Sequence, residues 1–395
     1  MPPPAIYLDN NATTRIDPAI ARRMLELQLQ GLANPASQHR PGRLALRLLE
    51  EAKADLLQSL GAPHTGIHSA QLILTSGGTE ANNLAIRGYA AQSSGIIVVA
   101  ASEHPSVMEA ARQLPPERLR ILPVDHCGRS DLDLLRQWLQ QDAARIQLVS
   151  VMLGNNESGA LEDLGSITEL CQHYGVPVHS DAVQAVSKID LDMGRLGLSA
   201  LTFTAHKMHG PVGIGGLILL PGEHISPLLV GGGQQLGIRP GTEAVVPAVA
   251  LAQAVTLGDQ ARAEGQYTAV AHLRDRFEHA LAAAGPVEVV AAAGRRLPHV
   301  SNIAFLGVDR QALHMALDLA GVACSTGSAC ASGSGRPSPV LTAMGLSAEA
   351  VRSSIRFSFS RFTTADEIDT ACSIIIQVVN KLRSRPAGLA PSAGS

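Results

Sequence analysis

Lys207 is the residue whose surroundings best suit a chemical role. It follows an apolar run at 200–204 and precedes a glycine-rich turn that leads into a second apolar run. A lysine at the end of a buried strand can be desolvated, which lowers its pKa and makes the amine available as a nucleophile toward a carbonyl group. A surface lysine that merely ends a strand is the alternative, and Lys207 alone does not decide between the two.

Two motifs upstream of Lys207 indicate which carbonyl compound it would meet. Residues 76–80, SGGTE, precede a helical run, and such a turn can hold a phosphate at the helix N-terminus. Asp181 ends another apolar run, where a carboxylate needs a partner such as a protonated pyridine nitrogen. Taken singly, the first could be an ordinary capped helix and Asp181 an ordinary N-cap. Asp181 followed by Lys207 one βαβ step later, with a phosphate cradle upstream, is the pattern expected for pyridoxal phosphate.

The elements that must position these residues alternate regularly along the chain. Apolar runs predict strands at 71–76, 96–101, 145–153, 176–181 and 200–204, with helical patterns between them. Strands that are apolar throughout and alternate with helices indicate a mostly parallel sheet covered on both faces. In such sheets, ligands bind at the carboxyl ends of the strands. The polar residues that follow the predicted strands are Thr79, His104, Asn156, Asp181, Gln184, His206 and Lys207.

The pattern changes after about residue 258, where a long predicted helix at 260–284 precedes short strands and a glycine- and serine-rich stretch. We therefore predict an α/β protein with a large domain at 15–258, built on a mostly parallel sheet. A smaller α+β domain would combine 1–14 with 259–384. Residues 385–395 are rich in proline, alanine, glycine and serine, which is typical of a disordered tail.

Composition excludes several classes of function. Of the 395 residues, 46% are hydrophobic and 16% charged, and the net charge of −3 comes with no basic stripe, so we expect no nucleic-acid partner. The sequence has no apolar stretch of membrane-spanning length and no secretory signal, so we expect a cytoplasmic protein without a membrane partner. The five cysteines are scattered and form no CxxC pair, so we predict no metal site.

A series of motifs, all in one order, resembles the class V, fold-type I pyridoxal-phosphate enzymes and, more narrowly, the cysteine desulfurases of the NifS/IscS group. The resemblance runs from Tyr7 to about Arg383. Its motifs are TSGGTEANN, SEHPSV, NNESG, HSDAVQ, AHKMHGP, GGGQQLGIRPGTE, STGSACASG and SSIRFSFSRFTT. It implies the fold of a fold-type I pyridoxal-phosphate-dependent transferase.

The resemblance implies a role for each matching residue. Lys207 would hold pyridoxal phosphate as a Schiff base, His104 would lie over the ring and move protons, and Cys330 would be the nucleophile. The other cofactor-binding residues would be Gly78, Thr79, Asn156, Asp181, Gln184, Thr204, His206 and Thr242. Thr242 would reach the phosphate of a second subunit, which implies a homodimer. Arg356 would pair with the substrate carboxylate in bidentate fashion, with Asn34 and Asn10 on the substrate side.

Cys330 decides the type of reaction. Its glycine- and serine-rich surroundings give a thiolate the exposure that a nucleophile needs. The resemblance implies that L-cysteine is converted to L-alanine, with a persulfide left on Cys330 for a sulfur-acceptor protein such as an iron–sulfur scaffold. One alternative is a selenocysteine lyase, which shares the fold, the lysine and the loop cysteine. A second is a non-catalytic assembly subunit, against which the intact set of reactive residues argues.

Overall fold

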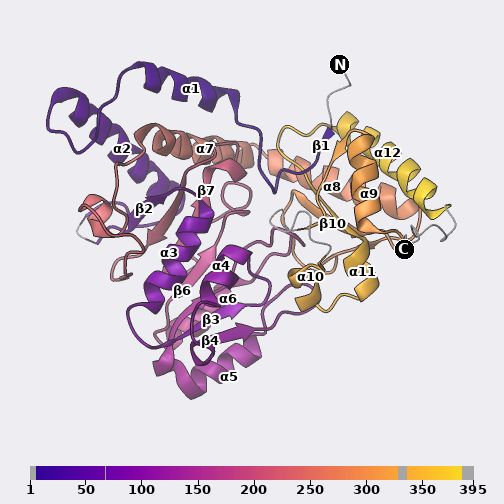
Figure 1. The fold of residues 1–395 in the computed structure, drawn as a ribbon, viewed down its shortest axis with the longest axis horizontal. Helices are drawn as coiled ribbons and strands as arrows, with labels where there is room; N and C mark the ends of the chain where they lie inside the picture. The colour runs from indigo at the N-terminus through magenta and orange to yellow at the C-terminus, as the bar shows by residue number, and fades with distance from the viewer. Residues whose placement is uncertain (1–5, 67, 328–335, 385–395) are drawn as a thin grey trace, which may run out of the picture.

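The computed structural model describes residues 6–66, 68–327 and 336–384. Its larger part is built on a seven-stranded sheet with the order β2-β8-β7-β6-β5-β3-β4 (Figure 1). The strands are β2 (Gln71–Thr75), β3 (Ile96–Ala100), β4 (Leu119–Leu122), β5 (Ile146–Ser150), β6 (Val178–Asp181), β7 (Ala200–Thr204) and β8 (Gly215–Leu219). Only β8 runs against its neighbours, so the predicted mostly parallel sheet is confirmed.

Both faces of this sheet are buried, because its strands are apolar on both sides. In β3, Ile96 and Val98 face one core, whereas Ile97 and Val99 face another. One face is covered by α3 (Gly78–Ala90) and α4 (Pro105–Ala111). The opposite face is covered by α2 (Arg40–Ser59), α5 (Leu132–Asp142), α6 (Leu164–His173) and α7 (Val245–Ala263), and α1 (Pro18–Leu29) packs on α7. This is the two-sided cover that a parallel sheet needs.

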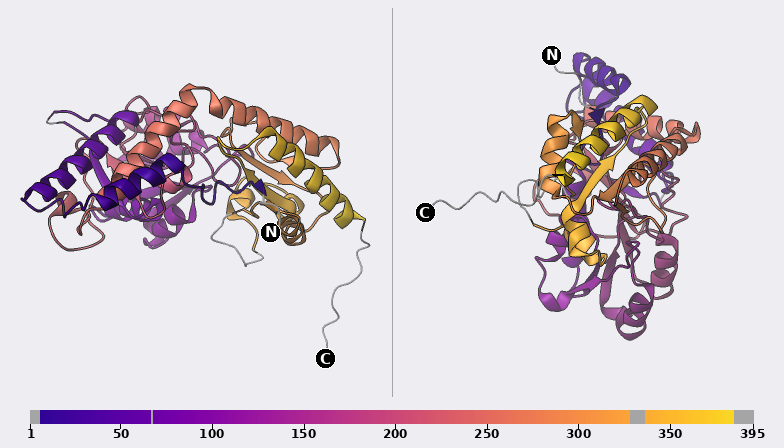
Figure 2. Two further views of the ribbon diagram at one scale, coloured as in Figure 1. Left: turned by 90° about the horizontal axis from the view of Figure 1, so that it is seen from above. Right: turned by 90° about the vertical axis from the view of Figure 1, so that its right-hand side faces the viewer.

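A smaller part surrounds an antiparallel sheet with the order β12-β10-β9. Its strands are β9 (Glu288–Val289), β10 (Val300–Ala304) and β12 (Ser354–Ser358), and its helices are α8 (Gln266–Ala283), α9 (Arg310–Leu319), α10 (Pro339–Ala343), α11 (Ala348–Ser353) and α12 (Ala365–Arg383). Figure 2 shows α8 and α12 side by side against this sheet. Here β1 (Ile6–Tyr7) pairs with β11 (Val322–Ala323), which brings the N-terminal segment among the C-terminal elements (Figure 1).

Short 3-10 helices complete the chain: η1 (Pro116–Arg118), η2 (Ala143–Arg145), η3 (Ala205–Lys207) and η4 (Gln234–Gly237). Among the described residues, no helix is both long and apolar enough to cross a membrane. The buried residues of the large part's core run along the sequence as far as Val255, and only Leu297 and Val300 are added later. The core of the smaller part contains Leu8 and then residues from Tyr267 onward. The domain boundary predicted after residue 258 lies within α7 and remains a prediction.

Two predicted elements differ from the structure. The helix expected at 260–284 is two helices, because Gly265 adopts φ +78 between α7 and α8, a conformation that glycine reaches without a Cβ clash. The strand expected at 145–153 ends at Ser150, where the chain leaves the sheet and enters the site described below. The predicted disordered tail, 385–395, lies outside the described residues.

Candidate functional site

The carboxyl ends of five strands meet at one edge of the large sheet. β3, β5, β6 and β7 are parallel, and β2 points the same way because β2 and β7 both run antiparallel to β8. A cavity of about 240 Å³ opens at this edge. The predicted residues that line it are Gly78, Thr79, His104, Asn156, Asp181, Gln184, Thr204, His206, Lys207 and Arg356. The fold therefore gathers residues that are far apart in the sequence.

Two predicted substrate-side asparagines do not line the cavity. Asn10 is buried, and its Nδ2 donates to the carbonyl of Ser358 at 2.8 Å. Asn34 is exposed, and its Oδ1 accepts from the backbone N–H of Ala36 at 2.9 Å. Both side chains thus stabilise local backbone, and the neighbouring Asn11 is the residue that faces the cavity. Substrate contacts by Asn10 and Asn34 remain predictions.

Two further predicted residues are not part of the cavity as described. Thr242 is exposed and does not line the cavity of its own chain. This position is compatible with a contact to the site of a second subunit. Cys330 falls outside the described residues. The roles of both remain predictions.

Lys207 ends η3, directly after β7. Its amine donates to the backbone carbonyls of Asn11 and Ala12, the latter at 2.8 Å. The turn that follows β1 therefore packs against Lys207, and its residue Asn11 lines the cavity. Asn11 was not singled out from the sequence, although it lies only four residues after Tyr7, where the resemblance begins.

Asp181 is buried at the end of β6, and both of its oxygens accept hydrogen bonds. Oδ1 accepts from the backbone N–H of Val183 at 2.9 Å, and Oδ2 accepts from Nδ2 of Asn82 at 2.7 Å. These bonds fix the direction of the carboxylate and offset part of the cost of burying it. A carboxylate held in this way can pair with a cation in the cavity. Asn82, on α3, was not predicted.

The two histidines that line the cavity both have a lowered pKa. Burial lowers the pKa of His104, and the charges of Lys207 and Arg356 lower it further against the opposing effect of Asp181. Burial, with the charge of Lys207, lowers the pKa of His206 to about 4. We therefore expect both histidines to be neutral and able to act as hydrogen-bonding groups.

Arg356 reaches the cavity from β12 and is almost completely buried. Its Nη2 pairs with Oδ1 of Asp9 at 2.8 Å, and its Nη1 donates to the carbonyl of Asn156 at 3.0 Å. Nε has no hydrogen-bond partner among the described residues. A buried guanidinium with donor capacity to spare is suited to a carboxylate ligand.

The cavity has the groups that pyridoxal phosphate requires. The first turn of α3 has Gly77 as its N-cap and no side-chain capping bond, so its N–H groups can meet a phosphate. Asp181 can pair with the ring nitrogen, and the Lys207 amine lies in the same cavity. The buried Oδ1 of Asn156 has no partner among the described residues, as expected for an atom that a ligand would satisfy.

Residues 6–370 match the family described as aminotransferase class V, and the chain belongs to this family. The family is one of pyridoxal-phosphate enzymes. The chain is 37% identical to a cysteine desulfurase of Bradyrhizobium diazoefficiens over 383 residues, which cover 96% of this chain and 95% of the relative. It is also 37% identical to the cysteine desulfurase NifS of Azotobacter vinelandii over 384 residues, covering 96% and 94%.

A comparison with solved structures points to the same family. A NifS-like protein from Rickettsia africae has a TM-score of 0.87 and 32% identity, covering 95% of this chain and 99% of its own. The resemblance and the fold type predicted from the sequence are thereby confirmed. Because the curated relatives reported above are named cysteine desulfurases, the alternative of a selenocysteine lyase is not favoured.

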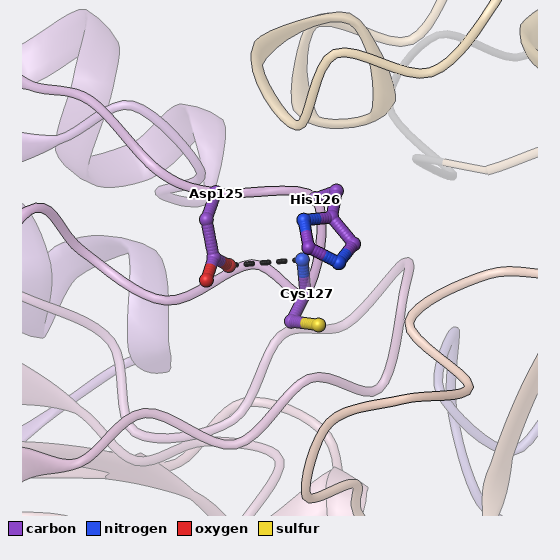
Figure 3. A group of neighbouring side chains, drawn as sticks. All are labelled: Asp125, His126 and Cys127. Carbon is purple, nitrogen blue, oxygen red and sulfur yellow. Dashed lines mark hydrogen bonds between the residues drawn. The ribbon is translucent and has the colours of Figure 1, made fainter.

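One group of potential metal ligands lies away from the cavity, in the turn at Asp125, His126 and Cys127 (Figure 3). Its ligand atoms lie within 4.8 Å of one another. The Asp125 carboxylate, however, already accepts from the backbone N–H groups of Cys127 and Arg129 and from the Arg129 guanidinium. These bonds would compete with an ion, and we assign no metal to this turn.

Proposed function

We propose that this chain is a cysteine desulfurase that uses pyridoxal phosphate to convert L-cysteine to L-alanine. The observation that carries the proposal is the meeting of Lys207, Asp181 and Arg356 in one cavity of a class V aminotransferase fold. The identity with named cysteine desulfurases over almost the whole chain supports the reaction type.

Each residue has a task in this reaction. Bound pyridoxal phosphate supplies an electron sink for the pair left when the substrate's Cα–H bond breaks. Lys207 takes that proton, and Asp181 keeps the ring nitrogen protonated through its charge. Arg356 orients the substrate through its carboxylate; Asp9 occupies Nη2, which leaves Nε among the available donors.

Cys330 completes the transfer in this proposal. Its thiolate attacks the substrate's sulfur, so that the Cβ–S bond breaks while a bond between the two sulfur atoms forms. The former substrate leaves as alanine after protonation of its carbon, and the extra sulfur stays on Cys330 as a persulfide. No external oxidant or reductant is needed, because the electron pair of the broken Cβ–S bond stays with carbon, so that carbon is reduced while the two sulfur atoms are oxidised to the persulfide level.

We also propose a homodimer in which Thr242 contributes to the partner's phosphate site. Four large apolar side chains are exposed on the segments that precede Thr242, and such a concentration is typical of an interface. They are Val212, Leu229, Val230 and Leu236, which are 77%, 55%, 95% and 73% exposed. The proposal further includes a cytoplasmic location and a sulfur-acceptor protein, such as an iron–sulfur scaffold.

The reaction is tested by measuring alanine released from cysteine by the wild type and by Lys207→Ala and Cys330→Ala. Both variants should lose the activity, and Lys207→Ala should also lose the visible absorption of the lysine-bound cofactor. Cys324→Ser is the matched control, because Cys324 is buried and burial raises its thiol pKa to about 12, which makes it a poor nucleophile. Alanine release that survives in Cys330→Ala would overturn the role of Cys330.

A further inference from the structure

A line of hydrogen bonds joins Asp181 to His104 through Asn82 and Ser106, neither of which was predicted from the sequence. Nδ2 of Asn82 donates to Oδ2 of Asp181 at 2.7 Å and to Oγ of Ser106 at 2.8 Å. Oγ of Ser106 lies 2.8 Å from Nδ1 of His104, and the backbone N–H of Ser106 donates to the same nitrogen at 3.1 Å. Asn82, Ser106 and Asp181 are buried, so solvent does not compete for these bonds.

The direction of each bond follows from counting hydrogens. A carboxylate only accepts, so the amide of Asn82 must turn its Nδ2 toward Asp181. A backbone N–H only donates, so Nδ1 of His104 must be an acceptor toward the Ser106 amide. Because a nitrogen that accepts from the amide carries no proton of its own, Oγ of Ser106 can only donate its hydrogen to Nδ1. Nδ1 therefore accepts from two donors and carries no proton.

We propose that Ser106, oriented by Asn82, is a positioning residue that fixes neutral His104 as the tautomer with its proton on Nε2. His104 lines the cavity, and in the resting protein its second ring nitrogen, Nε2, is an N–H donor and has no free lone pair. Acting as a base through Nε2 would require a proton on Nδ1, which would then face the Ser106 amide N–H. His104 thus serves as a hydrogen-bond donor, and the task of removing the substrate's proton stays with Lys207.

The tautomer follows from the contacts alone, whereas its value for catalysis rests on the proposed function. A purely structural role for Ser106 is the competing explanation, because the Nδ1 atom of His104 also caps α4 through the Ser106 N–H. The two explanations differ in what they predict for the protonation of His104. If Ser106 were only part of the helix cap, its replacement would change the stability of the protein alone. In the proposed role, its replacement also changes the proton affinity of one ring nitrogen of His104.

The test is nitrogen NMR of the cofactor-loaded enzyme with labelled histidine, where His104→Gln identifies the signals of His104. In the wild type near neutral pH, Nδ1 should show the shift of an unprotonated nitrogen and Nε2 that of a protonated one. In Ser106→Ala, Nδ1 loses a donor, and the proton affinity of His104 should rise about tenfold, as expected for the loss of one ordinary hydrogen bond. Ser106→Thr keeps the hydroxyl and should restore the wild-type titration.

Ser150→Ala is the matched control, because Ser150 is a buried serine whose Oγ lies 2.9 Å from Nδ1 of a different histidine, His179. It should alter the signals of His179 and leave those of His104 unchanged. A protonated Nδ1 in wild-type His104 would overturn the inference, and so would an unchanged titration in a folded Ser106→Ala that retains the visible cofactor band. The wild-type spectrum needs no variant of Ser106, so the inference is testable even if Ser106→Ala does not fold. If alanine release fails while the expected tautomer is found, the proposed function is wrong and the inference stands.

Discussion

Replacing Lys188 by methionine should stabilise the cofactor-free protein at neutral and lower pH, and the gain should shrink as the pH rises. Lys188 is 5% exposed, and its amine donates to the backbone carbonyl and side-chain Oε1 of Gln184, at 3.2 and 3.4 Å. Among the described residues it forms no ion pair with a carboxylate. Burial, aided by the charge of Lys207, lowers the pKa of Lys188 to about 7 from an ordinary 10.5.

The sign of the effect follows from proton binding. Between pH 7 and 10.5 the unfolded chain holds a proton on Lys188 that the folded chain has released, so stability rises with pH across this window. The cost of burial is fully present below pH 7 and is absent above 10.5. This lowering of the pKa means that the buried lysine reduces the free energy of unfolding by roughly 5 kcal/mol at low pH. Roughly 2 kcal/mol of this reduction remains near pH 9.

The assay is urea unfolding of the wild type and Lys188→Met across the range from about pH 6 to pH 9, over which the difference in free energy of unfolding should fall by roughly 3 kcal/mol. The bond lost by Gln184 costs the variant about 1–3 kcal/mol, but this cost should be nearly independent of pH. Lys381→Met, at an exposed lysine on α12, is the matched control and should show a constant difference. A constant difference for Lys188→Met as well would refute the reasoning.

Three further predictions concern single contacts. Arg356→Lys cannot bind a carboxylate in bidentate fashion, so its KM for cysteine should rise about 10- to 100-fold with a smaller change in kcat, and unchanged steady-state kinetics would contradict the assigned role. Gly215→Ala would place a Cβ 2.8 Å from the carbonyl carbon of Gly77, which precedes the first turn of α3 where the phosphate would bind. Titration with pyridoxal phosphate, followed by visible absorption, should therefore show weaker cofactor binding. Wild-type affinity would show that the phosphate site does not depend on the close packing of Gly215 and Gly77. Asp17→Ala removes the carboxylate that pairs with the buried guanidinium of Arg361, so urea unfolding should show a loss of about 3–5 kcal/mol, and a loss within experimental error would mean that the pair contributes nothing.

The residues at strand ends could be predicted from the sequence because their signal is local. Asp181 is the last residue of the buried strand β6, and Lys207 closely follows the buried strand β7, and a charged residue at the end of a buried strand is the pattern of a ligand site. Asn82 and Ser106 carry no such signal, because both lie within helices, where a polar residue usually faces solvent. The packing of α3 against α4 brings Asn82 to Ser106, whereas Ser106 meets His104 through a local contact between residues two apart.

The contribution of the N-terminal segment could not be predicted from residue patterns for a different reason. Asp9 and Asn11 come to the site through the pairing of β1 with β11, a contact between opposite ends of the sequence. β1 is only two residues long, so periodicity cannot reveal it. Lys188 illustrates a further limit, because no local pattern distinguishes a fully buried lysine from one that lies on the surface.

The central claim is that sulfur from cysteine passes to Cys330. The direct measurement is to incubate the cofactor-loaded enzyme with cysteine, digest it without a reducing agent and determine the mass of the peptide that contains Cys330. The proposed function predicts that this peptide gains the mass of one sulfur atom, that the gain accompanies alanine release, and that it is absent in Lys207→Ala. Alanine release without any added sulfur on Cys330, or added sulfur on another cysteine in its place, would contradict the account.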